Sequence, residues 1–128
     1  MALSEAKLME VEQALKENPD FMTQDDHIEE HVKGDYWNGL FNSTQTRGNF
    51  YFTREKMIFV SGWGLNSFAI KYSDIREVRK CMISLFIPTG ILVTAVDENG
   101  KEKKYKCSVL KRAQWLEFLS RKTGIALA

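Results

Sequence analysis

The stretch Gly48–Ser61, GNFYFTREKMIFVS, decides the fold class of this chain. Aromatic and β-branched side chains recur in both of its halves, and the short segment Thr53–Lys56, TREK, separates them. Aromatic and β-branched residues favour extended strands, and a short polar segment between two such runs favours a tight turn. We therefore predict two antiparallel strands, residues 48–53 and 56–61, joined by a hairpin.

The same pattern continues on both sides of this hairpin. Short runs rich in aromatic and β-branched residues alternate with turn signals. The clearest turn is Asn99-Gly100, because both residues tolerate the positive φ that a primed hairpin turn needs. The other predicted strands are DYWNGLF (35–41), SFAIKY (67–72), MISLFI (82–87), GILVTAV (90–96) and KKYKC (103–107).

A helix is predicted near the N-terminus, from Glu5 to Glu17. Ser4 is a candidate N-cap, and Pro19 ends the run. The helix carries a narrow apolar stripe at helical spacing, formed by Leu8, Val11 and Leu15. We expect this stripe to dock on the rest of the chain, either in cis or across a homodimer.

A second helix is predicted from Val109 to Lys122. Ser108 is its candidate N-cap and Gly124 suits the C′ position. Its apolar face is broad, and is formed by Trp115, Leu116, Phe118 and Leu119. A helix with this much aromatic surface must bury it, and the open end of a small β-sandwich is where we expect it to pack.

These elements predict a mainly β (α+β) fold: a seven-stranded antiparallel sandwich or partly open barrel, capped by the C-terminal helix, with an extra N-terminal helix. We assign residues 1–34 to an acidic N-terminal helix and linker, and residues 35–124 to the β domain. Hydrophobic residues at 44% and charged residues at 27% are globular values. The polar N-terminus lacks the apolar core of a secretion signal, so we expect a cytoplasmic location.

The net charge of +1 hides an asymmetry along the chain. Residues 1–45 hold three basic and ten acidic residues, a net charge of −7, whereas residues 46–128 hold fifteen and seven, a net charge of +8. Such an asymmetry suggests either an anionic partner for the second part or an acidic first part that docks on it. Both alternatives stay open at this point.

Four stretches of the sequence resemble the GRAM domain family, within the pleckstrin-homology-like group. GNFYFTREKMIFVS resembles the start of that domain, and FAIKYSDIREVRK resembles its Ile-x-Tyr/Leu-x-Asp-Ile segment with a basic tail. IPTGILVTAV is similar to its Pro-Asn-x-Ile-x-Ile stretch, with Thr89 where asparagine is more usual, and YKCSVLKRAQWLEFL resembles the closing strand and helix. The resemblance covers residues 48–119. It implies a pleckstrin-like sandwich used for lipid binding or for protein contact.

Alternation along the strands predicts which side chains face the interior. Successive side chains of a strand point to opposite faces, so residues two apart share a face. The side chains expected to line the interior are Phe50, Phe52, Ile58, Val60, Phe68 and Ile70. The basic runs REVRK and KEKKYK are expected to mark a solvated face or a protected edge strand.

No catalytic or metal site is predicted. HIEEH, from His27 to His31, has the His-x-x-Glu-His order of inverted zinc peptidases, but it stands in a probable acidic linker and the chain has no other histidine. No Ser-His-Asp set can be assembled, and no phosphate loop is present. We expect a non-enzyme without cofactor or metal, with Cys81 and Cys107 as two reduced, half-buried thiols.

The candidate binding residues gather in predicted loops. Trp63 and Leu65, in SGWGLNS, either fold back onto the domain or anchor it in a partner or a membrane interface. Arg47 in the first inter-strand loop, and Lys101 with Lys103 on the last hairpin, are expected near the same end. An apolar tip with a basic surround suits an anionic headgroup.

Two kinds of partner remain for this end of the domain. Because LFNSTQTRG offers only one cation, Arg47, we favour a protein partner or self-association, with peripheral binding of anionic membrane lipid as the alternative. Nucleic acid is not expected, because aromatics do not interleave with the lysines as a stacking platform requires. We also expect no small-molecule substrate.

Overall fold

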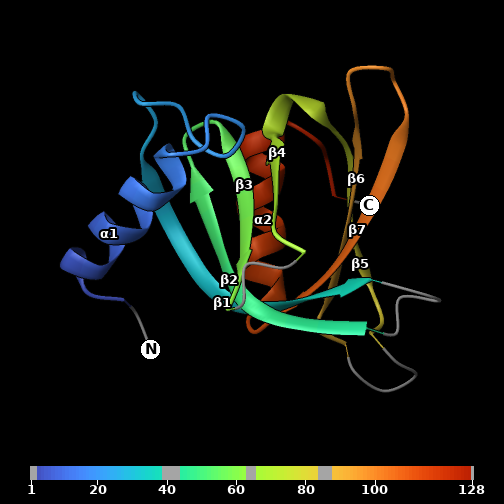
Figure 1. Cartoon of the computed structure of the whole chain (residues 1–128). Coiled ribbons are helices and arrows are strands. Elements are labelled where there is room, and N and C mark those ends of the chain that lie inside the picture. Colours follow the sequence, from blue (N-terminus) through green and yellow to red (C-terminus); the bar gives the residue numbers. More distant parts are fainter. Residues whose placement is uncertain (1–2, 39–43, 63–65, 84–87, 128) are drawn as a thin grey trace.

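Two helices flank seven strands in the computed structural model of the chain (Figure 1), which describes residues 3–38, 44–62, 66–83 and 88–127. One helix precedes the strands and the other follows them, as the sequence predicts. The elements in chain order are α1 (Glu5–Lys16), β1 (Ile28–Asn38), β2 (Thr44–Thr53), β3 (Lys56–Ser61), β4 (Phe68–Lys71), the 3₁₀ turn η2 (Tyr72–Asp74), β5 (Ile75–Cys81), β6 (Gly90–Val96), β7 (Glu102–Val109) and α2 (Arg112–Thr123).

The strands form one curved antiparallel sheet in the order β4-β3-β2-β1-β7-β6-β5. The ring of Phe68 on β4 lies 4.5 Å from that of Tyr105 on β7, although three strands separate β4 from β7 within the sheet. The sheet therefore folds over a shared core. Its two edge strands, β4 and β5, do not pair with each other, so the barrel is only partly closed. The predicted fold class is confirmed.

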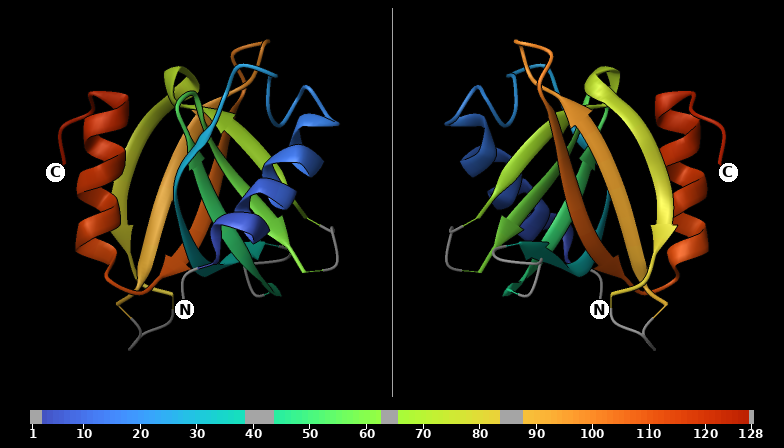
Figure 2. Two further views of the ribbon diagram at one scale, coloured as in Figure 1. Left: turned by 90° about the vertical axis from the view of Figure 1, so that its left-hand side faces the viewer. Right: turned by 90° about the vertical axis from the view of Figure 1, so that its right-hand side faces the viewer.

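The helix α2 closes one side of this core. The Trp115 ring stacks on Phe52 with centroids 5.1 Å apart, and Leu116 and Leu119 are buried beside it. Figure 2 shows α2 alongside β5, with α1 on a different side of the sheet. The broad apolar face of the C-terminal helix thus packs where the sequence predicts.

The predicted interior is wrong for β3. Phe50, Phe52, Phe68 and Ile70 face the core as expected, but Ile58 and Val60 lie in a second cluster on the outer face of the sheet. The pairing of β2 with β3 sets this parity, because it places Phe59 opposite Phe50 and Met57 opposite Phe52. Both faces of β3 are apolar, so alternation along its sequence could not tell which one faces the core.

The outer face of β2 and β3 is covered by α1 in cis. Leu8, Val11 and Leu15 pack there with Tyr51 and Ile58. The predicted docking of the N-terminal stripe is therefore realised within one chain. The predicted N-cap is also confirmed, since the helix begins after Ser4, whose Oγ accepts a hydrogen bond from the backbone N–H of Lys7 at 3.2 Å.

Glu12 ties α1 to the start of β1. Its carboxylate accepts the backbone N–H of Ile28 at 3.0 Å and lies 3.3 Å from His27 Nδ1 and 3.4 Å from Lys16 Nζ. Burial by itself raises the pKa of Glu12, but these hydrogen bonds and the Lys16 charge outweigh it and hold the pKa below its usual value. The ionised carboxylate therefore stabilises the docked helix.

Several strand boundaries differ from the prediction; β2, for example, begins at Thr44 and not at Gly48. Residues 28–34, expected as linker, are the first part of β1, so the HIEEH segment ends in a strand. The fifth strand is Ile75–Cys81; of the predicted strand Met82–Ile87, the first two residues are not in a strand and residues 84–87 lie outside the described residues. In β5 only Ile75 and Val78 are buried, and an irregularity in the pairing between Ile75 and Glu77 breaks the period of two. Charged residues occupy four of its five remaining positions, so the sequence shows no alternation that would identify the strand.

The start of α2 also differs from the prediction. Ser108 belongs to β7, where its Oγ accepts the indole N–H of Trp37 at 3.0 Å, so it does not cap the helix. The residue before the helix is Lys111, in the left-handed region at φ 56°. The predicted end is confirmed, because Gly124 adopts φ 75° and donates to Ser120 O at 2.9 Å.

Other features follow the sequence more closely. A hairpin joins β6 to β7 as predicted, but only Gly100 of its turn has positive φ. Both cysteines are free thiols; Cys81 is half-buried, whereas Cys107 is fully buried.

Gly34 and Gly48 face each other across β1 and β2, where the sheet allows no side chain. A Cβ on Gly48 would lie 2.2 Å from the carbonyl oxygen of Val60, and one on Gly34 would lie 2.5 Å from that of Ser108. Both contacts are with backbone, which has little freedom to give way. The two glycines therefore let the backbone of β3 approach β2 closely and the backbone of β7 approach β1 closely.

Candidate functional site

The predicted apolar tip, Trp63 and Leu65, lies outside the described residues. Whether these two side chains fold back onto the domain or anchor it in a partner or a membrane interface therefore stays open. The three predicted cations are described, and they line two different pockets.

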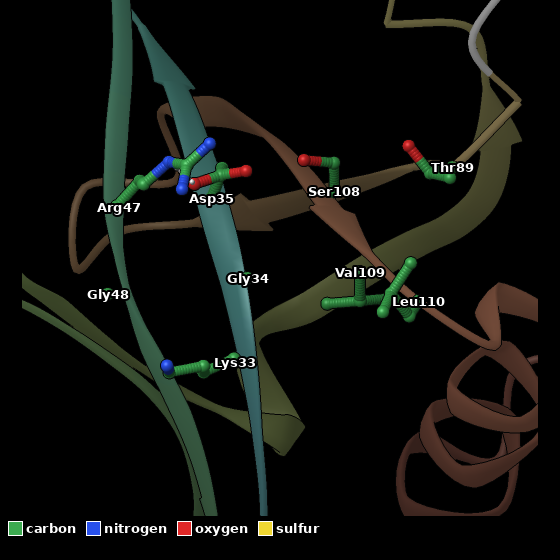
Figure 3. Close-up of a pocket in the computed structure, with 9 residues that line it drawn as sticks. All are labelled: Lys33, Gly34, Asp35, Arg47, Gly48, Thr89, Ser108, Val109 and Leu110. Carbon is green, nitrogen blue, oxygen red and sulfur yellow. Dashed lines mark ion pairs between the residues drawn. The ribbon is translucent and has the colours of Figure 1, made fainter. Parts of the chain in front are cut away.

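Arg47 lies in β2, not in a loop as predicted, and lines a pocket beside the paired segments of β1 and β7 (Figure 3). Its Nε is 3.8 Å from Asp35 Oδ1, and Figure 3 shows the two side chains facing each other from neighbouring strands. The Arg47 side chain is 86% exposed, so this ion pair is weak. The pocket has a volume of about 380 Å³, and its lining residues are Lys33, Gly34, Asp35, Arg47, Gly48, Thr89, Ser108, Val109 and Leu110.

Lys101 and Lys103 line a second pocket, of about 590 Å³, between β4 and the β6–β7 hairpin. Lys103 Nζ lies 5.0 Å from the centroid of the Tyr105 ring. Carboxylates outnumber the two lysines in this lining: they are Asp74, Asp97, Glu98 and Glu102. The pocket is therefore mixed in charge, with an acidic excess.

A third pocket, which the sequence did not reveal, is a groove between β5 and α2. Its volume is about 350 Å³. Among the described residues, the lining combines three cations with three apolar residues and has no carboxylate: Arg79, Lys80, Arg112, Ala113, Leu116 and Leu127. We call it the β5–α2 groove. The other two pockets each contain at least one carboxylate, whereas the described lining of this groove carries only apolar and positively charged side chains.

The groove opens along the edge of β5. Neighbouring residues of a strand point to opposite faces, so a pocket lined by both Arg79 and Lys80 lies at the strand edge. The Arg112 side chain reaches across from α2, where its Nη1 donates to the carbonyl oxygens of Cys81 at 3.2 Å and Gly90 at 3.5 Å. These two bonds fix the helix against the end of β5.

Positive charge is concentrated beside the Cys81 thiol at this end of the groove. Burial raises the pKa of Cys81, while the charges of Lys106, Arg79 and Arg112 act in the opposite direction. Burial outweighs the cations, so the thiol stays protonated at neutral pH. The arrangement does not activate a nucleophile.

The sequence contained one signal for this groove. REVRK was predicted to be a solvated face or a protected edge strand, and β5 is indeed an edge of the sheet. What the sequence could not show is that α2 brings Arg112 and Leu116 beside it, because that depends on how the helix packs.

Neither a protein-family model nor a curated protein sequence matches the chain. Solved structures do. The C-terminal domain of an unknown protein from Leishmania infantum is 18% identical, with a TM-score of 0.67 over 88% of this chain and 97% of that one. The Vps36 N-terminal PH domain is 12% identical, with a TM-score of 0.57 over 81% and 83%.

The PDZ-RhoGEF DH/PH fragment, solved in complex with activated RhoA, is 11% identical with a TM-score of 0.67. The match covers 93% of this chain but 39% of that one. The chain has a pleckstrin-homology-like fold. At these identities the likeness shows the fold alone, and the narrower GRAM resemblance stays a prediction.

The histidines of this PH-like domain do not form the helical pair that a peptidase needs. His31 lies in β1, with its ring 6.4 Å from that of Tyr51, and His27 is exposed beside Glu12. Among the described residues, no three His, Cys, Asp or Glu side chains are grouped so that they could hold a metal ion. Within the same residues, no helix is long and apolar enough to cross a membrane.

Proposed function

We propose that this PH-like domain is a non-catalytic binding module whose partner is another protein. The charge distribution around the three predicted cations carries the proposal. Arg47 faces Asp35, and Lys101 shares its pocket with four carboxylates. Lys33 and Arg47 stand beside the single carboxylate of Asp35 in the first pocket, and carboxylates are in excess in the second, so both places are mixed in charge. A protein surface can present both signs to such places, whereas a lipid headgroup presents negative charge alone.

The structural neighbours are consistent with a protein partner. The DH/PH fragment of PDZ-RhoGEF is solved in complex with RhoA, which is a protein. Because this likeness is one of fold, it supports the class of partner by analogy and does not identify it.

Vesicle sedimentation tests the alternative. We expect no pelleting of the protein that depends on acidic lipid, when phosphatidylcholine vesicles are compared at low salt with vesicles that also contain phosphatidylserine or a phosphoinositide. Pelleting that requires acidic lipid, falls with added salt, and is lost in Trp63→Ala or in Arg47→Ala would overturn the proposal and establish peripheral lipid binding.

A positive test uses purified components. A partner captured from cells, once purified, should form a complex of fixed stoichiometry with this chain in light scattering and calorimetry. The absence of any such complex for every purified candidate, together with lipid-dependent pelleting, would leave the membrane function in place of the one proposed.

A further inference from the structure

We propose that the pocket between β4 and the hairpin joining β6 to β7 binds a basic side chain, arginine or lysine, of the partner protein. We call it the hairpin pocket; it is the one lined by Lys101, Lys103 and four carboxylates (Figure 1). This inference rests on the proposed function and adds to it the place of binding and the chemical class of the ligand.

The first support is the apolar floor of the hairpin pocket. Ile70 and Ala95 are each 5% exposed and belong to the main core, and Tyr105 packs against that core. The pocket volume of about 590 Å³ can take a whole side chain. Arginine and lysine lay their aliphatic stems along apolar surface and keep the charged head at its edge. The floor therefore suits the stem of a basic residue.

The second support is a set of unpaired carboxylates around this floor. Asp97, Glu98 and Glu102 lie on the hairpin side of the pocket, and Asp74 lies on the side next to β4. Within the part of the chain that the structure describes, none of the four forms an ion pair, not even with the two lysines of the same lining. Exposed carboxylates at a turn are common, but these approach one apolar pocket from two sides. A cation between them is attracted by both.

The third support is the aromatic ring in the lining. Lys103 Nζ lies 5.0 Å from the centroid of the Tyr105 ring, so a cation already occupies the face of this ring. Lys103 is exposed and can turn into solvent when another cation arrives. A guanidinium both stacks on an aromatic face and pairs with a carboxylate, which an ammonium does less well. We therefore expect arginine to bind more tightly than lysine.

The same lining disfavours other side chains of a partner. An acidic group would be repelled by the four carboxylates. A purely apolar side chain would bring these carboxylates into an interface without a partner, which costs free energy. A basic side chain satisfies both the floor and the carboxylates.

Peptide selection on the full chain tests the inference. A random peptide library displayed on phage is sorted on the immobilised protein, and the selected peptides are synthesised and measured by fluorescence anisotropy. We expect peptides that contain arginine, with binding that weakens as salt is added. Replacing that arginine by citrulline, which keeps its shape and removes its charge, should weaken binding by about tenfold or more.

Neutralising the carboxylates tests the site on the protein. The combined variant Asp74→Asn, Glu98→Gln, Glu102→Gln should weaken binding by about tenfold or more, because each exposed charge contact contributes up to about fivefold. Asp97 is kept, since its Oδ1 accepts two backbone N–H groups that form the turn. Glu117→Gln, an exposed change on α2 outside the lining, should bind as the wild type does.

Two positions in the lining separate recognition from a merely structural role. Tyr105→Phe keeps the ring face and should preserve binding, whereas Tyr105→Leu keeps only the apolar character and should weaken it. Lys103→Gln should strengthen binding by about two- to fivefold, because it removes the cation that competes for the ring. Thermal unfolding followed by circular dichroism shows whether each variant is folded.

Several outcomes overturn the inference and leave the proposed function in place. These are selection of no peptide or of peptides without a basic residue, equal binding of the citrulline peptide, wild-type affinity of the combined variant, or association of the chain with itself through this pocket. Spermidine binding as tightly as the selected peptides, and through the same carboxylates, would show a site for a free polyamine instead. Lipid-dependent pelleting without any protein complex would overturn the proposed function itself.

Discussion

Replacing Leu15 by alanine tests whether α1 is a packed part of the domain. Leu15 is 6% exposed and lies in the outer cluster with Met22, Tyr51 and Ile58. Leu→Ala changes at buried sites cost about 2–5 kcal/mol. Because this cluster is small and its rim is partly exposed, we expect the lower part of that range, about 2–3 kcal/mol. The melting temperature of a chain this size should then fall by about 8–12 °C.

The matched control lies on the same helix. Met9 is 66% exposed, so Met9→Ala removes little packing and keeps a strong helix former. Urea unfolding of both variants, followed by fluorescence, gives the two free energies of unfolding. If Leu15→Ala is no less stable than Met9→Ala, α1 does not pack on the sheet in solution, and the outer cluster is not part of the folded core.

Three further predictions concern the same fold. Deleting residues 1–20 should expose the outer cluster and lower the melting temperature or induce association in size-exclusion chromatography; an unchanged profile would mean that α1 is a free tail. Gly48→Ala should cost about 1–3 kcal/mol or more from overpacking against backbone, measured by urea unfolding. Because the pKa of Glu12 is lowered on folding, the stability it contributes is present above its unfolded pKa and is lost as pH falls through the folded one. Glu12→Gln should therefore be about 1–2 kcal/mol less stable at neutral pH and lose less on acidification, and exposed Glu10→Gln should match the wild type.

A fourth prediction concerns the thiols. Burial raises the pKa of Cys107 far above neutral, so this thiol should react with a disulfide reagent at pH 8 only when the protein unfolds. The half-buried Cys81 should react first. Rapid modification of both thiols in the native state would show that the core around Cys107 opens readily.

Strands buried on both faces could be predicted closely from the sequence. β3 and β6 begin and end where their apolar runs do, because packing on each side demands apolar residues at nearly every position. β1 and β5 could not be predicted as well. Their exposed positions are charged, and their signal is reduced to a few buried residues such as Val78.

The binding surfaces were harder to predict than the strands. Loop positions suggested that Arg47 and Lys101 share one site, but the register places Arg47 opposite Asp35 and the curvature of the sheet gives the lysines a pocket of their own. The groove beside β5 needs two facts that only packing supplies, namely which strand ends the sheet and where α2 lies. Sequence alone can name the basic residues but not their neighbours.

The position of Leu127 in the lining affects any protein in which the chain is extended past Ala128. Leu127 lines the groove, and Figure 2 marks the C-terminus beside α2. A segment tethered there acts at an effective concentration in the millimolar range, so even a weakly binding tag would occupy the groove. An affinity tag for binding measurements therefore belongs at the N-terminus, ahead of α1.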